Sequence, residues 1–259
     1  MTAMRPGTLD QISVLLDDAM RRRTTVARIE ESYPGLTRGD AYAIQKKLVD
    51  LRLDRGGSLV GIKMGLTSRA KMQQVGVDEA IWGRLTSDMA IDEGASIDLG
   101  RFIHPRIEPE IAYLLRRDLA GDEAPAAIMA AVEAVMPAME IIDSRYDQFR
   151  FGPTDVIADN TSAAGFVLGA PFGAGTDLSN LGIILKVDGR PLQTGSSAAI
   201  LGHPLRALAM ASRFAAAASM PLKAGQVVLA GAATQASPCE RGTVVEAVFQ
   251  RHRVMVAFD

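Results

Sequence analysis

Residues 104–115 run His-Pro-Arg-Ile-Glu-Pro-Glu-Ile-Ala-Tyr-Leu-Leu, and the part from Ile107 to Leu115 has the length and composition of a β-strand. Side chains two positions apart in a strand point to the same face. Glu108 and Glu110 therefore share one face, which Ala112 and Leu114 continue. Because apolar residues extend this face, we predict that the two carboxylates are not simply exposed to solvent.

Similar strand-like runs occupy the chain after Ser58. They are Leu59–Met64, Ala138–Ile142, Phe166–Leu168, Ile183–Val187, Val227–Ala230, Val244–Phe249 and Val254–Phe258. Asp188-Gly189 predicts a hairpin between two of these strands. Helices are predicted over Ala126–Val135, with Pro125 at its first position and Pro137 ending it, and near Leu205–Ser219. Strands and helices do not alternate regularly, which favours an α+β fold with a largely antiparallel or mixed sheet over a doubly wound one.

The first part of the chain is predicted to be helical. Thr8 and Gln11 have the spacing of a capping box, and Pro34-Gly35 predicts a turn. A second helix is expected to start near Asp40 and to stop at Gly56-Gly57, with Tyr42 and Gln45 as either functional or packing residues on it. We therefore predict an N-terminal helical region over residues 1–57 and a β-rich catalytic domain over residues 58–259, together forming one structural unit.

Composition narrows the class of protein. Of 259 residues, 48% are hydrophobic and 22% charged, and the net charge of −2 gives no reason to expect a nucleic-acid partner. The N-terminus lacks a secretory h-region, and charged residues and a proline interrupt the apolar stretch 126–142, so no membrane span is expected. The single cysteine, Cys239, fits a cytoplasmic location. The mean hydropathy of +0.12 suggests buried subunit interfaces, and hence a homo-oligomer.

The expected chemistry is that of a hard cation. The sequence lacks a dinucleotide fingerprint, a P-loop, a zinc-protease motif and a nucleophile elbow. His104, His203 and His252 are scattered, and each is expected to be structural or exposed. A site built on nitrogen and sulfur ligands is therefore disfavoured, whereas oxygen ligands remain.

Glu140 turns the carboxylate pair into a candidate metal site. Two adjacent carboxylates repel each other unless a cation lies between them. A solvent-exposed edge strand, which Pro109 would keep unpaired, is the alternative that would also accommodate them. Glu140 lies in an apolar run, where an unpaired carboxylate is costly. Three glutamates suit Mg²⁺ or Mn²⁺ and would leave about three coordination positions open. The alternative for Glu140 is a salt bridge with Arg145 or Arg106.

Lys63 is the second candidate residue. Gly61 and Gly65 flank it on the same strand face and are expected to leave space for a ligand beside the ammonium group. A lysine near three carboxylates would balance charge and attract an anionic substrate. The alternative is an exposed strand lysine.

Several segments together resemble the hydratase/decarboxylase family of the fumarylacetoacetate hydrolase superfamily. They are residues 40–45, 61–68, 108–112, 137–146 and 158–162, and the resemblance extends from about Ile12 to Phe258. It implies a fumarylacetoacetate hydrolase C-terminal-like mixed β-sandwich roll with an N-terminal helical region. It also implies Mg²⁺ or Mn²⁺ on Glu108, Glu110 and Glu140, an active-site lysine at Lys63 and substrate binding by Ser162. The His–Glu pair of the superfamily's hydrolases finds no match here, which puts hydrolysis in doubt.

The amino-acid sequence of residues 61–72 resembles that of the decarboxylase branch of the family. Hydratases of the family carry an Asp at the position of Ile81, just before an aromatic-Gly pair that matches Trp82-Gly83. Ile81 would form an apolar, substrate-binding wall, unless it reflects simple sequence drift. The resemblance thus implies metal-dependent decarboxylation of a 2-oxo dicarboxylic acid, 2-oxohex-3-enedioate, in meta-cleavage degradation of aromatic compounds. The alternatives are 2-hydroxypenta-2,4-dienoate hydration and a non-catalytic partner of the pathway hydratase, with which a complex is in any case possible. Intact Lys63 and the three glutamates argue against the non-catalytic alternative.

Overall fold

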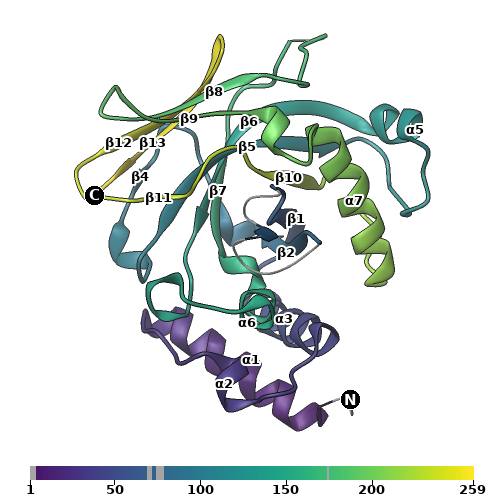
Figure 1. Ribbon diagram of the computed structural model, residues 1–259, viewed down its shortest axis with the longest axis vertical. Coiled ribbons are helices and arrows are strands. Elements are labelled where there is room, and N and C mark those ends of the chain that lie inside the picture. Colours follow the sequence, from purple (N-terminus) through teal and green to yellow (C-terminus); the bar gives the residue numbers. More distant parts are fainter. Residues whose placement is uncertain (1–3, 69–71, 74–78, 174) are drawn as a thin grey trace.

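The computed structural model describes residues 4–68, 72–73, 79–173 and 175–259. Two sheets form the body of the molecule, and the N-terminal helices lie at one end of it (Figure 1). Residues 69–71 of the segment that suggested the decarboxylase branch lie outside the described part. Within the described part, no helix is both long and apolar enough to cross a bilayer.

The N-terminal part is helical, as predicted. Its helices are α1 (Pro6–Arg22), α2 (Ile29–Ser32) and α3 (Arg38–Leu53). The start predicted at Thr8 is wrong, because Arg5 is the N-cap and Pro6 fills the first turn, where its missing N–H costs nothing. Thr37 and Asp40 form the capping box of α3, so Asp40 lies inside the first turn of the expected helix.

The larger sheet has eight strands in the order β2-β1-β10-β5-β6-β7-β3, with β11 paired to β5. Their bounds are β1 Leu59–Gly65, β2 Ile81–Thr86, β3 Ala90–Ile91, β5 Arg106–Leu115, β6 Val132–Ile142, β7 Ala163–Leu168, β10 Val227–Ala232 and β11 Ser237–Pro238. The helix predicted over Ala126–Val135 is too long, since α5 spans only Pro125–Ala130. Residues from Val132 onward pair with β5 instead, because ladder bonds and packing outweigh local helix preference.

The smaller sheet has five strands in the order β4-β13-β12-β8-β9. Their bounds are β4 Ser96–Ile97, β8 Gly182–Val187, β9 Arg190–Ser196, β12 Val244–Phe249 and β13 His252–Phe258. The predicted hairpin at Asp188-Gly189 is confirmed, with φ of 49° and 75° at these residues. Further helices are α6 Pro153–Ala158 and α7 Pro204–Ala217, with the 3₁₀ turns η1 Ser87–Met89, η2 Leu99–Arg101, η3 Asp147–Phe149, η4 Asn160–Ser162 and η5 Ser197–Ala199.

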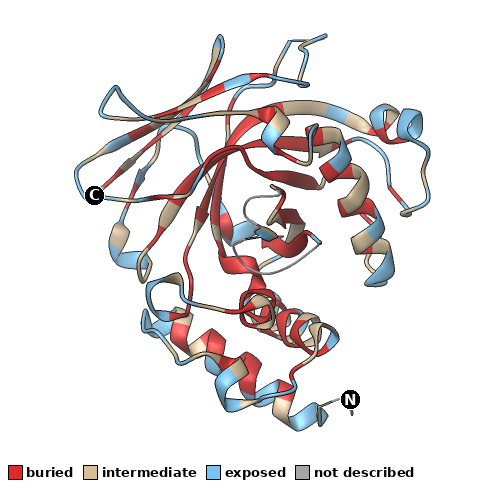
Figure 2. Cartoon of the chain, viewed as in Figure 1, coloured by how far each residue is buried: buried red, intermediate tan, exposed pale blue. Residues whose placement is uncertain are grey.

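The two faces of the large sheet differ. One face packs with the smaller sheet and α7 into the main apolar core, to which Ile107, Ile111 and Tyr113 of β5 belong. Alternation sends Glu108, Glu110 and Ala112 to the other face, where Ala112 joins a smaller apolar cluster with Leu229. Figure 2 shows that most of the strand residues in this region are buried. The mixed α+β fold is thus confirmed, and its curled sheet positions carboxylates above an apolar base.

Candidate metal centre

Glu108, Glu110 and Glu140 converge, as the sequence predicted. In the register of β5 and β6, Glu108 lies directly opposite Glu140. One carboxylate oxygen from each of the three residues lies within 4.8 Å of the others, and all three side chains are buried. The edge-strand alternative is wrong, because β5 is interior to the sheet. Pro109 is tolerated there because its partner strand breaks between β10 and β11 beside it.

Lys63 belongs to the same cluster. It is only 2% exposed, which rules out the surface alternative. Its Nζ lies 2.9 Å from Glu140 Oε2 and donates a hydrogen bond to the Thr161 carbonyl at 3.0 Å. The salt bridges considered for Glu140 are not formed. Arg145 pairs with Asp159, and Arg106 lies over the Phe149 ring at 4.3 Å.

The glycines beside Lys63 do not leave ligand space, contrary to the prediction. A Cβ on Gly61 would lie 1.9 Å from the Val227 carbonyl oxygen, and one on Gly65 would lie 2.6 Å from Thr161 Cγ2. Both positions are filled by close approach of other parts of the protein. The glycines therefore permit the tight packing that surrounds Lys63.

Several carboxylate oxygens of the cluster are buried without a hydrogen-bond donor among the described residues. Within the described part of the chain, Glu110 Oε1 and both Glu140 oxygens accept no hydrogen bond, although Lys63 forms its ion pair with Glu140. Glu110 Oε2 accepts one from Gly231 N at 2.7 Å. Buried carboxylate oxygens that lack hydrogen-bond donors fit a hard divalent cation, which prefers oxygen ligands.

The pKa values of the cluster also indicate a site for a cation. Burial, followed by repulsion from Glu140 and Glu108, raises the pKa of Glu110 well above its usual range. Burial also raises the pKa of Glu140 to about 7, with Lys63 opposing the shift and Glu108 adding to it. Burial opposes the charge of Lys63, but the three carboxylates together raise its pKa. Without a cation, the protein thus holds protons that a metal ion would displace.

Stability of the metal-free protein is expected to depend on pH. Burial raises the pKa of Glu140 to about 7 in the folded state, above the ordinary value of a glutamate, so the folded state binds more protons between the two values. The free energy of unfolding therefore falls as pH rises through this window. We expect the Tm of the chelator-treated protein to drop by roughly 5–10 °C between about pH 5 and pH 8. Saturating Mg²⁺ should remove most of the drop in thermal melts, whereas a metal-free Tm that rises with pH would contradict the prediction.

Ser162 and Ile81 adjoin residues that neighbour Lys63: Ser162 follows Thr161, and Ile81 is the cross-strand partner of Gly65. Ser162 is buried, and within the described residues its Oγ has no hydrogen-bond partner. It ends η4, in which Asn160, Thr161 and Ser162 have φ of 49°, 55° and 57°. Ile81 is 1% exposed and packs among the apolar residues of the N-terminal helices, near Gly65.

The histidines are structural where their contacts are described. The His104 Nε2 donates to the Ser144 carbonyl at 2.8 Å, since a carbonyl can only accept. The His203 Nδ1 accepts from Leu205 N at 3.1 Å and caps α7. Neither histidine belongs to the glutamate cluster.

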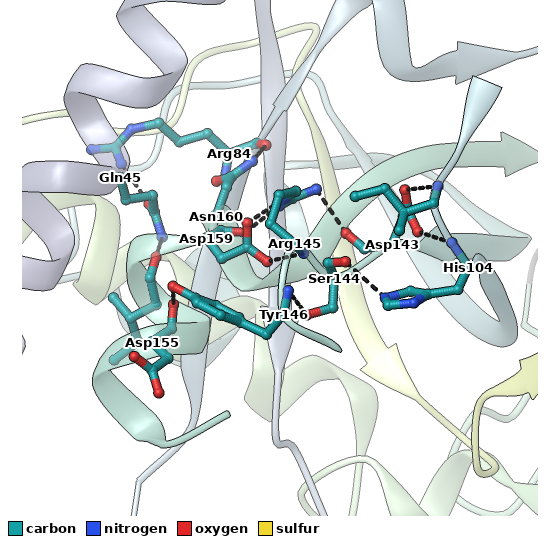
Figure 3. Close-up of polar contacts among 12 residues, drawn as sticks. Gln45, Arg84, His104, Asp143, Ser144, Arg145, Tyr146, Asp155, Asp159 and Asn160 are labelled. Carbon is teal, nitrogen blue, oxygen red and sulfur yellow. Dashed lines mark hydrogen bonds and ion pairs between the residues drawn. The ribbon is translucent and has the colours of Figure 1, made fainter. Parts of the chain in front are cut away.

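Sequence reasoning missed the polar network behind η4, which Figure 3 shows. Gln45 of α3 donates through Nε2 to the Trp82 and Ile157 carbonyls, both at 3.0 Å. Its Oε1 accepts from Arg84 Nη1 at 2.5 Å. From the sequence, Gln45 was expected to be either a functional residue or a packing residue on its helix. The backbone groups it binds lie far away in sequence, so side-chain patterns could not have revealed them.

Comparisons with known proteins agree with this geometry. The family model fumarylacetoacetate (FAA) hydrolase C-terminal matches residues 67–255. A Pseudomonas sp. protein named 4-oxalocrotonate decarboxylase is 54% identical over 211 residues, which cover 82% of each chain. A Paraburkholderia xenovorans strain LB400 protein named 2-keto-4-pentenoate hydratase is 36% identical over 246 residues, covering 94% of this chain and 91% of the relative.

A solved structure is similar over the full length of both chains. It is 4-oxalocrotonate decarboxylase from Pseudomonas putida G7, complexed with magnesium and adipate, with a TM-score of 0.96 and 32% sequence identity. The same protein has also been solved with calcium and acetate, with a TM-score of 0.94. The chain therefore belongs to the fumarylacetoacetate hydrolase family, and it is an enzyme of that family's hydratase and decarboxylase group.

Proposed function

We propose that this enzyme decarboxylates 2-oxohex-3-enedioate, which is 4-oxalocrotonate, to 2-hydroxypenta-2,4-dienoate and CO₂. The observation that carries the proposal is the convergence of three buried glutamates beside Lys63. Glu108, Glu110 and Glu140 would hold Mg²⁺, or Mn²⁺ as the alternative hard cation. The relatives named 4-oxalocrotonate decarboxylase, one of them solved with magnesium, support the reaction and the ion.

The bond changes follow from the substrate, a vinylogous β-keto acid. The C5–C6 bond breaks, its electron pair forms the C4–C5 double bond, and the C3–C4 pair moves to C2–C3. The C2 oxygen takes the resulting negative charge and then a proton, while C6 leaves as CO₂. A bound divalent cation supplies Lewis-acid stabilisation of that developing charge.

The chain's own residues would assist in three ways. Lys63 would donate a hydrogen bond to the C2 oxygen as its charge develops, because its ammonium group lies against the glutamate cluster. Ser162 would donate its free hydroxyl to the substrate. Ile81 would shield the departing carboxylate from water, which favours loss of the charged group.

Hydration of 2-hydroxypenta-2,4-dienoate is the second candidate, since relatives named hydratases are 36% identical. Hydration needs a group that positions water and delivers a proton near the diene terminus. The isoleucine side chain can neither donate nor accept a proton. Ile81 therefore favours decarboxylation.

The deciding experiment compares the two reactions on one purified enzyme with Mg²⁺. We expect kcat/KM for CO₂ release from 2-oxohex-3-enedioate to exceed that for dienoate hydration by at least about 100-fold, the lower end of an acid–base contribution. Each assay is repeated with excess chelator, which should abolish CO₂ release. A clear preference for hydrating the dienoate would replace the decarboxylase proposal and leave the family and the metal centre in place.

We infer that the enzyme is a cytoplasmic homo-oligomer that takes part in meta-cleavage degradation of aromatic compounds. Because the decarboxylation product is the substrate of a hydratase, a complex with that hydratase would pass it on directly. Val14 and Leu15 of α1, which are 48% and 46% exposed, offer apolar surface for assembly.

A further inference from the structure

The η4 turn holds the Thr161 carbonyl against Lys63 in an unusual backbone conformation. Its three residues, Asn160–Ser162, all have positive φ, although none is glycine. Each such conformation costs roughly 1–2 kcal/mol in a residue with a Cβ, so surrounding contacts must hold the turn. The Thr161 carbonyl in this turn accepts the hydrogen bond from Lys63 Nζ.

Asn160 supplies the main anchor. Its Oδ1 accepts from Arg84 N at 2.7 Å, and its Nδ2 donates to the Arg84 carbonyl at 2.9 Å. The side chain thus pairs with β2 as a neighbouring strand would. Gly83 allows the close approach, because a Cβ there would lie 2.5 Å from the Asn160 carbonyl oxygen.

The anchor lies directly behind Lys63. Gly83 is the cross-strand partner of Lys63 in the β1–β2 ladder. Thr161 Oγ1 donates to the Trp82 carbonyl at 2.8 Å, and Gln45 donates to that same carbonyl. Figure 3 shows Gln45, Arg84 and Asn160 next to one another, with Arg145 and Asp159 on the adjoining side. The turn is therefore bound to the strand that is paired with the strand carrying Lys63.

The segment that leads into the turn is held as well. Arg145 forms an ion pair with Asp159, and its Nη1 donates to the Asp143 carbonyl at 2.7 Å. Asp159 N donates to Asp155 O at 3.0 Å, so the turn follows directly on α6. At the other end of the turn, the Ser162 carbonyl accepts from Asp143 N at 2.9 Å. With both ends fixed, removal of the Asn160 side chain would release only the central residues.

We propose that Asn160 is a positioning residue for Lys63, which acts by holding the Thr161 carbonyl on the lysine Nζ. The inference rests on the proposed function in that it takes Lys63 as the group that meets the substrate. It predicts that the effect of Asn160 on turnover passes through Lys63, whereas a merely structural residue would act independently of it.

The test is a double-mutant cycle of Asn160→Gly with Lys63→Met. Glycine removes both side-chain hydrogen bonds but adopts positive φ without strain, so the fold is favoured. We expect Asn160→Gly to lower kcat/KM for CO₂ release by about 10–100-fold in the parent enzyme. In the Lys63→Met background the same change should cost less than about 3-fold, since the group it positions is absent. A full and independent loss in both backgrounds would overturn the proposal.

Tyr146→Phe is the matched control. It removes a buried hydrogen bond, from the Tyr146 hydroxyl to the Asp155 carbonyl at 3.1 Å, in the same network but without contact to Lys63. We expect a comparable fall in Tm with kcat/KM unchanged within about 3-fold. A loss of turnover as large as that of Asn160→Gly would show that general loosening of the network explains both.

A crystal structure of Asn160→Gly tests the geometry without any assay. We expect Lys63 Nζ and the Thr161 carbonyl to move beyond about 3.5 Å, outside hydrogen-bond distance. An unchanged contact would overturn the positioning role, even if the enzyme proves to be a hydratase. If Asn160→Gly does not fold, Thr161→Val removes the second hydrogen bond of the turn and takes its place in both experiments. A failure of Lys63→Met to reduce turnover would count against the proposed function instead.

Discussion

Replacing Glu140 by Gln is expected to weaken Mg²⁺ binding by at least about 100-fold. Replacing a residue that only hydrogen-bonds a metal ligand already lowers metal affinity by up to about 100-fold, and Glu140 is proposed to be a ligand itself. Glutamine keeps the shape of the side chain but removes the charge that lies opposite Glu108. It also leaves Lys63 without its ion-pair partner. Titration calorimetry with Mg²⁺ measures the effect, and decarboxylation should fall with it.

Glu246→Gln is the control for this change. Glu246 is also a strand glutamate with a lysine partner, Lys186 at 3.4 Å, but it lies on β12 in the smaller sheet. We expect its Mg²⁺ affinity and turnover to match the parent within about 2-fold, as for a partly exposed ion pair. Parent-like Mg²⁺ affinity in Glu140→Gln would show that the three glutamates do not share an ion.

Lys63→Met is expected to lower kcat by about 10²–10³, the usual cost of removing one donor from a developing oxyanion. Methionine fills the volume of the buried lysine but offers no hydrogen-bond donor to the C2 oxygen. The Mg²⁺-loaded protein should still fold, because the cation then balances the charge of Glu140. Steady-state kinetics and thermal melts on the Mg²⁺-loaded variant separate the two effects.

Lys46→Met serves as the matched control. Lys46 is an exposed lysine of α3 that pairs with Asp50 at 2.6 Å and belongs to neither the glutamate cluster nor the described contacts of Lys63. Its replacement should leave kcat unchanged and alter stability by less than about 1 kcal/mol. A near-normal kcat/KM in Lys63→Met would mean that the lysine has a structural role only.

The strands of the fold were predictable because their side chains follow simple alternation. The predicted strands Ile107–Leu115 and Leu59–Met64 lie entirely within β5 and β1. The β2 strand and the first half of β6 were missed. Residues 132–135 continue an alanine-rich helical pattern, and only their ladder with β5 makes them extended. The division into residues 1–57 and 58–259 stays a prediction.

The candidate site was predictable to the extent that it follows from charge. Three acidic residues in apolar strands must meet a cation, a base or each other, and here they meet one another and Lys63. The roles of Gly65 and Asn160 depend on which backbone segments approach them, and a single sequence does not reveal such long-range contacts. The roles of Ser162 and Ile81 stay proposals for the same reason.

Pro109 joins the chemistry of the site to the architecture of the molecule. It accepts from Ala233 N at 3.0 Å but has no N–H to return to the facing strand. Between β10 and β11 the chain leaves its ladder with β5, and the Ala233 carbonyl approaches β9, where a Cβ on Gly195 would lie 2.3 Å from it. Gln193 of β9 then binds both Ser237 Oγ, at 2.6 Å, and Gln235 N, at 3.1 Å. The missing N–H of Pro109, between Glu108 and Glu110, thus lies where the strand facing β5 is interrupted and the intervening residues contact the smaller sheet.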